Sequence, residues 1–382
     1  MQEADWTRAG QWSARRGIPA LLSSPIEDGV LFSTFGGRSA ADSPLALHDE
    51  LVRRDYPHRL VWEVADGTSV VPEGAETVVI GSREHLRALH TSRHLVANNN
   101  FPFYYRKHPD QTYLQTWHGT PLKKIGRHVP APNLSLSYRD LMSREAKAWD
   151  LLLAQNDFAS TTLAEALEFE GEVLNLGYPR NDLLTTGSDA DRARIRTRLG
   201  VSRDARLVLY APTWRDNVRT ATGGYAMVNH LELDVVSRAF GGDSVLLVRG
   251  HSNTPGLGDA TAANVVDVSR YPDITELMLV ADVLITDYSS MMFDFASTHR
   301  PMLFLTPDLA EYAGSTRGFY LDFAEIAPGP LLASTDEVLR SLTSLAQLET
   351  AYADRYDTFR TTFAPRDDGK AAARVVDAVW GR

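Results

Sequence analysis

Cysteine is absent from the 382 residues of this chain. That absence excludes disulfides, thiolate metal sites and a cysteine nucleophile. No stretch reaches the roughly 18 to 20 uncharged apolar residues that a membrane-spanning helix needs. Positive charge is also in short supply, with 39 Lys and Arg against 49 Asp and Glu and a formal net charge of −10. Because non-specific binding to nucleic acid needs a basic face, this balance argues against a nucleic-acid partner.

The N-terminus lacks the pattern of a secretory signal, because Glu3 and Asp5 open the chain and no long apolar run follows. We therefore expect a cytoplasmic protein. Trp6, Arg8 and Trp12 also occur here. They suit a short interfacial helix and peripheral association with the inner face of the plasma membrane. A loosely packed arm is the favoured interpretation of the same residues.

Strand-length apolar runs alternate with helix-periodic segments along almost the whole chain, a pattern typical of an α/β protein with mostly parallel sheets. In the first half we expect strands at Val30–Phe35, Arg59–Val64, Thr77–Gly81, His94–Ala97, Thr112–Thr116, Leu151–Gln155 and Glu172–Leu176. In the second half we expect strands at Arg206–Ala211, Val245–Arg249, Asn264–Val268, Asp282–Thr286 and Pro301–Thr306. Helices are expected at Pro44–Arg54 (capped by Ser43), Arg83–His90, Phe158–Phe169, Asp189–Leu199, Leu231–Phe240, Ile274–Ala281 and Met291–Thr298.

A turn-rich break, Gly177–Asp182, separates the two halves. We expect an N-terminal domain over residues 1–185 and a C-terminal domain over residues 186–382, each a Rossmann-like, doubly wound sheet. Ligands of such sheets collect beyond the carboxyl ends of the strands, so a cleft between the domains is the expected site. The last helical stretch, Thr335–Trp380, could fold back across the first half.

A phosphate-binding pattern follows the strand Asp282–Thr286. Thr286, Asp287, Ser289 and Ser290 stand between its end and the start of a helix, where hydroxyls, backbone N–H groups and the helix dipole converge. Such a turn suits a diphosphate without a metal. Simple N-capping by Asp287 or Ser289 is the alternative, and taken alone it is the stronger one.

Two other strand ends carry histidines. Arg249 and His251 follow one of them, where a cation and an imidazole suit a leaving diphosphate. Arg317 is a third expected phosphate contact. His118 follows another strand, where a neutral imidazole suits removal of a proton from an acceptor hydroxyl. Either histidine could instead serve only to hold its own turn together.

The turn around His118 adds further candidates. Gly119 allows the backbone to approach a ligand closely. Lys123 and Lys124 suit an anionic acceptor, although a lone lysine pair is more often solvated surface. Metal motifs of the His-Glu-x-x-His kind, GxGxxG and the P-loop are absent where a strand meets a helix. We therefore expect neither a metal nor a dinucleotide cofactor.

In chain order, these segments resemble the CDP-glycerol glycerophosphotransferase family, which includes teichoic acid primases and polymerases and capsule polymerases. The resemblance covers about Val30 to Leu331. The matching segments are Phe35–Asp42 (FGGRSAAD), Tyr113–Ile125 (YLQTWHGTPLKKI), Leu176–Leu184 (LGYPRNDLL), Tyr210–Asp216 (YAPTWRD), Arg249–His251, Asp267–Glu276 (DVSRYPDITE), Leu284–Asp294 (LITDYSSMMFD), Pro301–Tyr312 and Arg317–Leu331. As departures, Arg38 stands where the family usually has a lysine, and the first strand follows a shorter region than the membrane-targeting one of the family's polymerases.

The resemblance implies a GT-B-type architecture, in which two Rossmann-like domains face a cleft and the C-terminal one binds the nucleotide. It implies that His118 is the catalytic base and that His251 acts on the diphosphate side. The nucleotide side would comprise Arg249, Tyr271, Pro272, Asp273, Ile274, Glu276, Thr286, Asp287, Ser289, Ser290 and Arg317. The acceptor side would comprise Gly119, Thr120, Lys123 and Lys124. Within the nucleotide side, the loop Tyr271–Ile274 would meet the cytosine, and either Glu276 or Asp282 would reach the ribose.

The expected reaction moves glycerol phosphate, or a related alditol phosphate, from CDP-glycerol to a hydroxyl of a teichoic acid or capsular polymer, lipid-linked or free, and releases CMP. A GT-B nucleotide-sugar glycosyltransferase is one alternative, since it would share the cleft and the strand-end histidine. A non-catalytic docking domain of a wall or capsule synthase is the other. The docking domain is disfavoured, because histidines and serines at strand ends are typical of a catalytic site.

Overall fold

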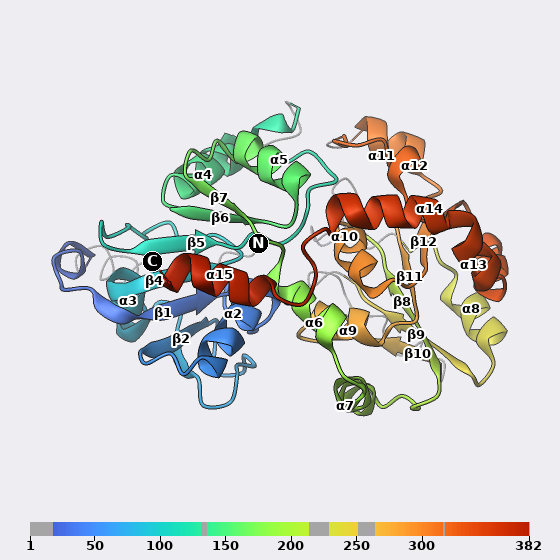
Figure 1. The fold of residues 1–382 in the computed structure, drawn as a ribbon, viewed down its shortest axis with the longest axis horizontal. Coiled ribbons are helices and arrows are strands. Elements are labelled where there is room, and N and C mark those ends of the chain that lie inside the picture. The colour runs from blue at the N-terminus through green and yellow to red at the C-terminus, as the bar shows by residue number, and fades with distance from the viewer. Residues whose placement is uncertain (1–17, 131–135, 214–228, 251–263, 316–317, 382) are drawn as a thin grey trace, which may run out of the picture.

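Parallel sheets form the centre of both halves of the chain, with helices packed around them (Figure 1). The structure, a computed structural model, describes residues 18–130, 136–213, 229–250, 264–315 and 318–381. Each pairing between neighbouring strands of the two sheets is parallel. This confirms the α/β architecture that the alternation of strand and helix patterns predicts.

Within the described residues, the N-terminal sheet has seven strands in the order β3-β2-β1-β4-β5-β6-β7. They are β1 (Glu27–Ser33), β2 (Arg59–Val64), β3 (Glu76–Val79), β4 (Ser92–Ala97), β5 (Thr112–Gln115), β6 (Leu151–Ala154) and β7 (Glu172–Asn175). The accompanying helices are α2 (Asp42–Arg53), α3 (Arg83–Thr91), the 3₁₀ helix η1 (Gly126–His128), α4 (Leu136–Ala146) and α5 (Asp157–Leu167). We call this unit the N-terminal lobe.

In the part of the chain that the structure covers, the C-terminal sheet has six strands in the order β10-β9-β8-β11-β12-β13. They are β8 (Arg206–Ala211), β9 (Ser244–Val248), β10 (Val265–Asp267), β11 (Val283–Thr286), β12 (Met302–Leu305) and β13 (Leu331–Leu332). The accompanying helices are α7 (Asp189–Leu199), α8 (Leu233–Phe240), α9 (Ile274–Val280), α10 (Met291–Phe295), η3 (Ala296–Thr298), α11 (Leu309–Ser315), α12 (Phe323–Ile326), α13 (Thr335–Thr343) and α14 (Leu345–Phe363). We call this unit the C-terminal lobe.

Local sequence explains why these elements form. The strands β6 (LLLA) and β12 (MLFL) are buried at every residue, as expected where helices cover both faces of a parallel sheet. The helix α5 begins where the Asn156 side chain accepts the Ala159 N–H at 2.8 Å. Ser188 and Asp191 form a reciprocal capping box at the start of α7.

Within the described residues, the chain crosses between the lobes twice. The first crossing contains η2 (Pro179–Asn181) and α6 (Asp182–Thr186). After α14, the second crossing leads to α15 (Ala371–Trp380), which lies beside α2 on the N-terminal lobe (Figure 1). Apolar residues of α15 pack in one buried cluster with residues of β1 and α2, and these α15 residues are Val375, Val376 and Val379. The last helix therefore completes the core of the first lobe.

The predicted strand positions agree with β1 to β12, with ends displaced by up to three residues. The expectation that Ser43 caps a helix is wrong, because α2 already begins at Asp42 and Ser43 lies inside its first turn. The edge strand β13 was not predicted, since two residues give too short a pattern. The long C-terminal helical stretch divides into α13, α14 and α15.

Val375 tests what α15 contributes to the N-terminal lobe. Its side chain is fully buried in the shared cluster. Val375→Ala should lower the free energy of unfolding by about 2 kcal/mol, because apolar burial is lost and a cavity is left. Val52→Ala, at an exposed position of α2, is the matched control and should stay within about 0.5 kcal/mol of the parent in urea unfolding. Equal decreases in the free energy of unfolding for the two variants would contradict the packing of α15 against the N-terminal lobe.

Candidate active site

The candidate residues gather where the strand order of each sheet reverses. The first sheet reverses between β1 and β4, and the second between β8 and β11. In open parallel sheets, the loops that leave the carboxyl ends at such points form a crevice for ligands. The segment Trp117–Thr120 follows β5, beside the first reversal, and Asp287–Ser290 follows β11 at the second.

His118 is held by a hydrogen bond to the backbone of the N-terminal lobe. Its Nδ1 lies 3.0 Å from the backbone oxygen of Asn98, the residue that follows β4. Because a carbonyl oxygen only accepts, Nδ1 carries the proton and Nε2 is unprotonated in the neutral ring. The ring stacks on Trp117, with the two centroids 4.6 Å apart. This arrangement leaves Nε2 as the proton-accepting nitrogen.

The surroundings of His118 favour its neutral form. Desolvation by the protein around the ring lowers its pKa, although the Asn98 hydrogen bond and the Asp42 charge act in the opposite direction. Part of the side chain is nevertheless open to solvent. An imidazole with a lowered pKa is ready to accept a proton at neutral pH. His118 is therefore accessible to solvent, has an unprotonated Nε2 and favours the neutral form, as a general base should.

The loop that contains His118 touches the serine turn of the other lobe. A Cβ on Gly119 would lie 2.7 Å from the Ser290 hydroxyl oxygen and 3.9 Å from Arg180 Nη2, so a larger residue would require the Ser290 side chain or the loop to shift. The next residue, Thr120, is buried, and its hydroxyl donates to Gln155 at 2.7 Å. Gly119 is thus one contact between the lobes, while Thr120 anchors the loop beneath it.

The turn after β11 contains two kinds of residue. Ser289 and Ser290 are partly exposed, and the Ser289 hydroxyl accepts the Met291 N–H at 3.3 Å. Thr286 and Asp287 are buried instead. Thr286 donates to the last carbonyl of β8 at 2.7 Å, and Asp287 accepts an N–H from the loop after β8 at 2.8 Å. The buried pair ties two strand ends together, whereas the two serines stay partly exposed.

Arg249 lies behind the loop that was expected to meet the cytosine. Its guanidinium donates to the backbone oxygens of Val268, at 3.0 Å, and of Tyr271. Burial lowers its pKa, against the charge of Asp273, but the ordinary value for arginine is so high that the group stays charged. Arg249 therefore supports this loop and adds fixed positive charge to the C-terminal side.

The loop Tyr271–Ile274 is partly exposed along its length, including Pro272. Asp273 caps α9 by accepting the Thr275 N–H at 2.8 Å. Burial raises the pKa of Asp273 to about 6, with smaller contributions from the charges of Glu276 and of Asp42 in the N-terminal lobe. The interaction with Asp42 brings this loop into the neighbourhood of the N-terminal lobe.

Glu276 already has partners within the C-terminal lobe. Its carboxylate accepts from Arg194 at 2.8 Å, from Arg198 at 3.1 Å and from the Tyr271 hydroxyl. A ribose hydroxyl would have to share the carboxylate with these three groups.

The two lysines of the first lobe lie at a second contact between the lobes. Lys123 Nζ donates to the Tyr312 hydroxyl at 3.0 Å, and the backbone N–H of Lys124 donates to the Gly318 oxygen at 3.0 Å. An isolated antiparallel bridge joins Lys123 to Phe319. The lysines therefore bring positive charge to the junction of the lobes.

His251 and Arg317, both expected on the phosphate side, lie outside the described residues, as do Trp6 and Trp12. The convergence of His251 with His118 therefore stays a prediction. Among the residues that the structure does describe, no cluster of three or more acidic and histidine side chains is placed to hold a metal ion. No helix in the same residues has both the length and the apolar character to cross a membrane.

A buried polar node joins the lobes, and sequence reasoning missed it. Arg180, in η2, donates from Nη1 to Asp42 of the N-terminal lobe and from Nη2 to Asp294 of α10, both at 2.9 Å. Asn181 donates to Asp294 at 2.9 Å and to Asp367 at 2.8 Å. All five side chains are buried. The node connects both sheets and the second crossing of the chain.

The two carboxylates on Arg180 differ in their ionisation. Burial disfavours the charged form of both. For Asp42, the charge and hydrogen bond of Arg180, with hydrogen bonds from Ser43 and Asn98, outweigh burial and hold the pKa below its ordinary value. For Asp294, burial outweighs the same guanidinium and raises the pKa. Asp42 is thus the firmly ionised partner of Arg180.

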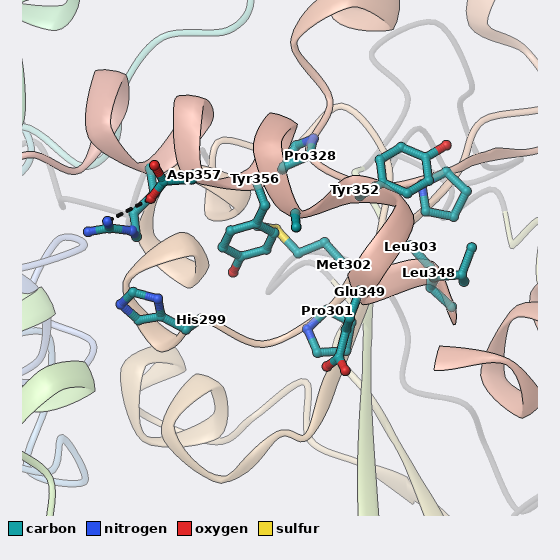
Figure 2. A pocket seen from close by; sticks show the side chains of 14 residues that line it. His299, Pro301, Met302, Leu303, Pro328, Leu348, Glu349, Tyr352, Tyr356 and Asp357 are labelled. Carbon is teal, nitrogen blue, oxygen red and sulfur yellow. Dashed lines mark hydrogen bonds and ion pairs between the residues drawn. The ribbon is translucent and has the colours of Figure 1, made fainter. Parts of the chain in front are cut away.

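A separate cavity lies away from these residues. Its volume is ≈ 420 Å³, and Figure 2 shows Tyr352 and Tyr356 of α14 near Pro301 and Met302 at the start of β12. In a parallel sheet, the start of β12 lies at the opposite edge from the carboxyl end of β11, where the serine turn begins. The cavity is therefore not the site described above.

Two Rossmann-like lobes that meet at a histidine loop and a serine turn define a GT-B-type protein. The family model described as CDP-Glycerol:Poly(glycerophosphate) glycerophosphotransferase matches residues 21–381. The chain therefore belongs to this family, which confirms the resemblance of its segments.

Individual relatives agree with the family model. The chain is 34% identical over 361 residues to a teichoic acid poly(glycerol phosphate) polymerase of Staphylococcus epidermidis, a match that covers 92% of this chain and 50% of that protein. It is 32% identical over 370 residues to a teichoic acid glycerol-phosphate transferase of Staphylococcus aureus, covering 94% and 95%. A solved structure of the wall teichoic acid polymerase TagF superposes with a TM-score of 0.88 at 32% identity, covering 97% and 94%. The chain thus spans about half the length of the polymerase and nearly all of the transferase.

Ionisation of Asp367 should make the stability of the folded protein depend on pH. Burial raises its pKa to about 6, above the roughly 3.9 of an unfolded chain. The folded state therefore binds the proton more tightly, and ionisation of Asp367 reduces stability as the pH rises from about 4 to 6. Asp367→Asn keeps an oxygen for the three donors, Gln155, Asn181 and Ser297. In urea unfolding, we expect this variant to be at least as stable as the parent at pH 7.5, with an advantage that shrinks toward pH 4.

The neighbouring Asp368 is the matched control. It is exposed and paired with Arg374 at 2.8 Å, and this hydrogen bond and charge outweigh burial and lower its pKa. Its stabilisation is present above the unfolded pKa and lost as the pH falls through the lower folded value. Asp368→Asn should therefore be slightly less stable than the parent at pH 7.5 and equal to it in acid. If Asp367→Asn were less stable than the parent by the same amount at every pH, the raised pKa of Asp367 would be contradicted.

Proposed function

We propose that this chain transfers glycerol phosphate from CDP-glycerol to a hydroxyl of a teichoic acid acceptor and releases CMP. The observation that carries the proposal is the placement of His118, whose Nδ1 is bonded to a carbonyl oxygen while its loop touches Ser290 of the other lobe. Family membership and the identity to a glycerol-phosphate transferase support the choice of donor.

In the proposed reaction, His118 Nε2 takes the proton of the acceptor hydroxyl while the hydroxyl oxygen attacks the β-phosphorus of CDP-glycerol. The new oxygen–phosphorus bond forms in line with the bond from that phosphorus to the bridging oxygen, which breaks and leaves with CMP. The proton passes from His118 to solvent after the transfer. A positioned general base of this kind contributes roughly 10²- to 10⁴-fold to a rate.

The C-terminal lobe would hold the donor. The hydroxyls of Ser289 and Ser290 suit the diphosphate oxygens, and Arg249 adds fixed positive charge nearby. We place the cytosine on the loop Tyr271–Ile274 and the ribose near Glu276. His251 and Arg317 would complete the phosphate side, and the scheme needs no metal.

The acceptor would enter along the N-terminal lobe. Gly119 keeps the backbone close to the reacting atoms, and Lys123 and Lys124 supply positive charge for an anionic polymer at the junction of the lobes. We further propose a cytoplasmic location and an acceptor of the teichoic acid or capsular class. A lipid-linked acceptor would add peripheral contact with the inner membrane surface.

A panel of donors separates this function from its alternatives. With a short glycerol-phosphate acceptor, the chain should release CMP from CDP-glycerol and add glycerol-phosphate masses to the acceptor. CDP-ribitol and UDP-sugars are the competing donors. Release of UDP would instead indicate a nucleotide-sugar glycosyltransferase. No release from any donor, together with binding to other synthases, would indicate a docking domain.

His118→Asn tests the base. The asparagine amide can occupy the position of Nδ1 and keep the bond to Asn98, but it places no acceptor where Nε2 stood. Release of CMP from CDP-glycerol should therefore fall roughly 10²- to 10⁴-fold. His58→Gln alters an exposed histidine of the same lobe and should keep the parent rate. Near-parent turnover in His118→Asn would rule out His118 as the base.

A further inference from the structure

Unusual backbone conformations surround Asn98, the residue whose backbone oxygen holds His118. Six non-glycine residues in the described part of the chain have a positive φ. Three of them stand at helix ends, where this conformation is common: Asp55, Glu168 and His299. The other three are Phe35, Asp42 and Trp117. Phe35 and Trp117 lie in the loops after β1 and β5, the two neighbours of β4, and Asp42 is the first residue of α2. Backbone strain of this kind gathers at functional sites.

Asn98 connects these loops through its hydrogen bonds. Its side-chain oxygen accepts the Phe35 N–H at 3.0 Å, and its side-chain amide donates to Asp42 Oδ2 at 2.9 Å. Its backbone oxygen accepts from His118 Nδ1 at 3.0 Å. Asp42 Oδ1 in turn accepts from Arg180 Nη1 at 2.9 Å. A continuous path of hydrogen bonds therefore runs from Arg180 through Asp42 and Asn98 to the imidazole.

The same path reaches the serine turn of the other lobe. Arg180 Nη2 donates to Asp294 at 2.9 Å, and Asp294 lies in α10, the short helix that begins directly after Ser290. Arg180, Asp42, Asn98 and Asp294 are all buried, so water does not readily replace these contacts. The imidazole of one lobe and the serine turn of the other thus share one chain of partners.

We propose that Asp42 is a positioning residue for His118, acting through Asn98 to fix the tautomer and orientation that leave Nε2 unprotonated. This inference rests on the proposed function, in which His118 is the base. Asp42 is buried in the node, so in this proposal it acts through Asn98 and does not contact the substrate.

Two charged side chains act on the pKa of His118 in opposite directions. Within the described residues, the charged side chains that act on His118 are Asp42, which raises its pKa, and Arg180, which lowers it. Asp42→Asn removes the first influence and retains the second. The pKa of His118 should therefore fall further in this variant, while the broken hydrogen bond to Asn98 loosens the imidazole.

The test is an NMR titration of the imidazole nitrogens in ¹⁵N-histidine-labelled protein, with His118→Asn used to assign the signals. In the parent, we expect His118 to be protonated at Nδ1. In Asp42→Asn, we expect a mixture of tautomers and a lower pKa. We also expect CMP release to fall roughly 10- to 100-fold, less than for loss of the base, with the KM for CDP-glycerol little changed.

Asp294→Asn is the matched control. It removes a similarly buried carboxylate from the same guanidinium but leaves the path from Asp42 to His118 intact. The tautomer and pKa of His118 should therefore match those of the parent. Equal shifts in both variants would show that the node acts only through general stability and would overturn the proposal. Unchanged imidazole signals in Asp42→Asn would overturn it as well.

A second variant, Asn98→Ala, tests the proposal if Asp42→Asn does not fold. Asn98→Ala removes the side chain that links Asp42 to His118 but keeps the ion pair of Asp42 with Arg180. It should therefore also give a mixture of His118 tautomers. Imidazole signals like those of the parent in this variant would overturn the proposal. The titration needs no donor substrate. If the parent releases no CMP, the proposed function fails while the positioning of His118 is still measured.

Discussion

One buried guanidinium, that of Arg180, sets the geometry on which the rest of the site depends. Taking its charge out of water costs several kcal/mol, so the carboxylates that receive it, Asp42 and Asp294, are required partners. Each lobe supplies one of them. Such buried pairs contribute little net stability but define an arrangement, because they are satisfied only when the start of α2 faces α10, the helix after the serine turn.

The distribution of charge follows from that arrangement. The N-terminal side presents a neutral imidazole, and the C-terminal side presents hydroxyl groups with the cation of Arg249 behind them. A neutral base beside the attacking hydroxyl and positive charge beside the leaving group is what a phosphoryl transfer requires. Asp42 lies close to this centre, but Arg180 balances its negative charge, so its repulsion of a donor phosphate is reduced.

Much of the fold could be predicted from the sequence because its signals are local. Apolar runs of four to six residues predict the buried strands, and the order of strand and loop predicts that His118 and Ser290 follow the carboxyl ends of β5 and β11. The node could not be predicted in this way. Arg180 is 138 residues from Asp42 and 114 residues from Asp294, and a charged residue beside a turn usually lies at the surface.

The most direct measurement is a crystal structure of this chain with CDP-glycerol bound. We predict that the β-phosphate lies between His118 Nε2 and the hydroxyls of Ser289 and Ser290, with the cytosine on the loop Tyr271–Ile274. A donor bound elsewhere, for example in the cavity beneath α14, or with its phosphates out of reach of His118, would contradict the site described here.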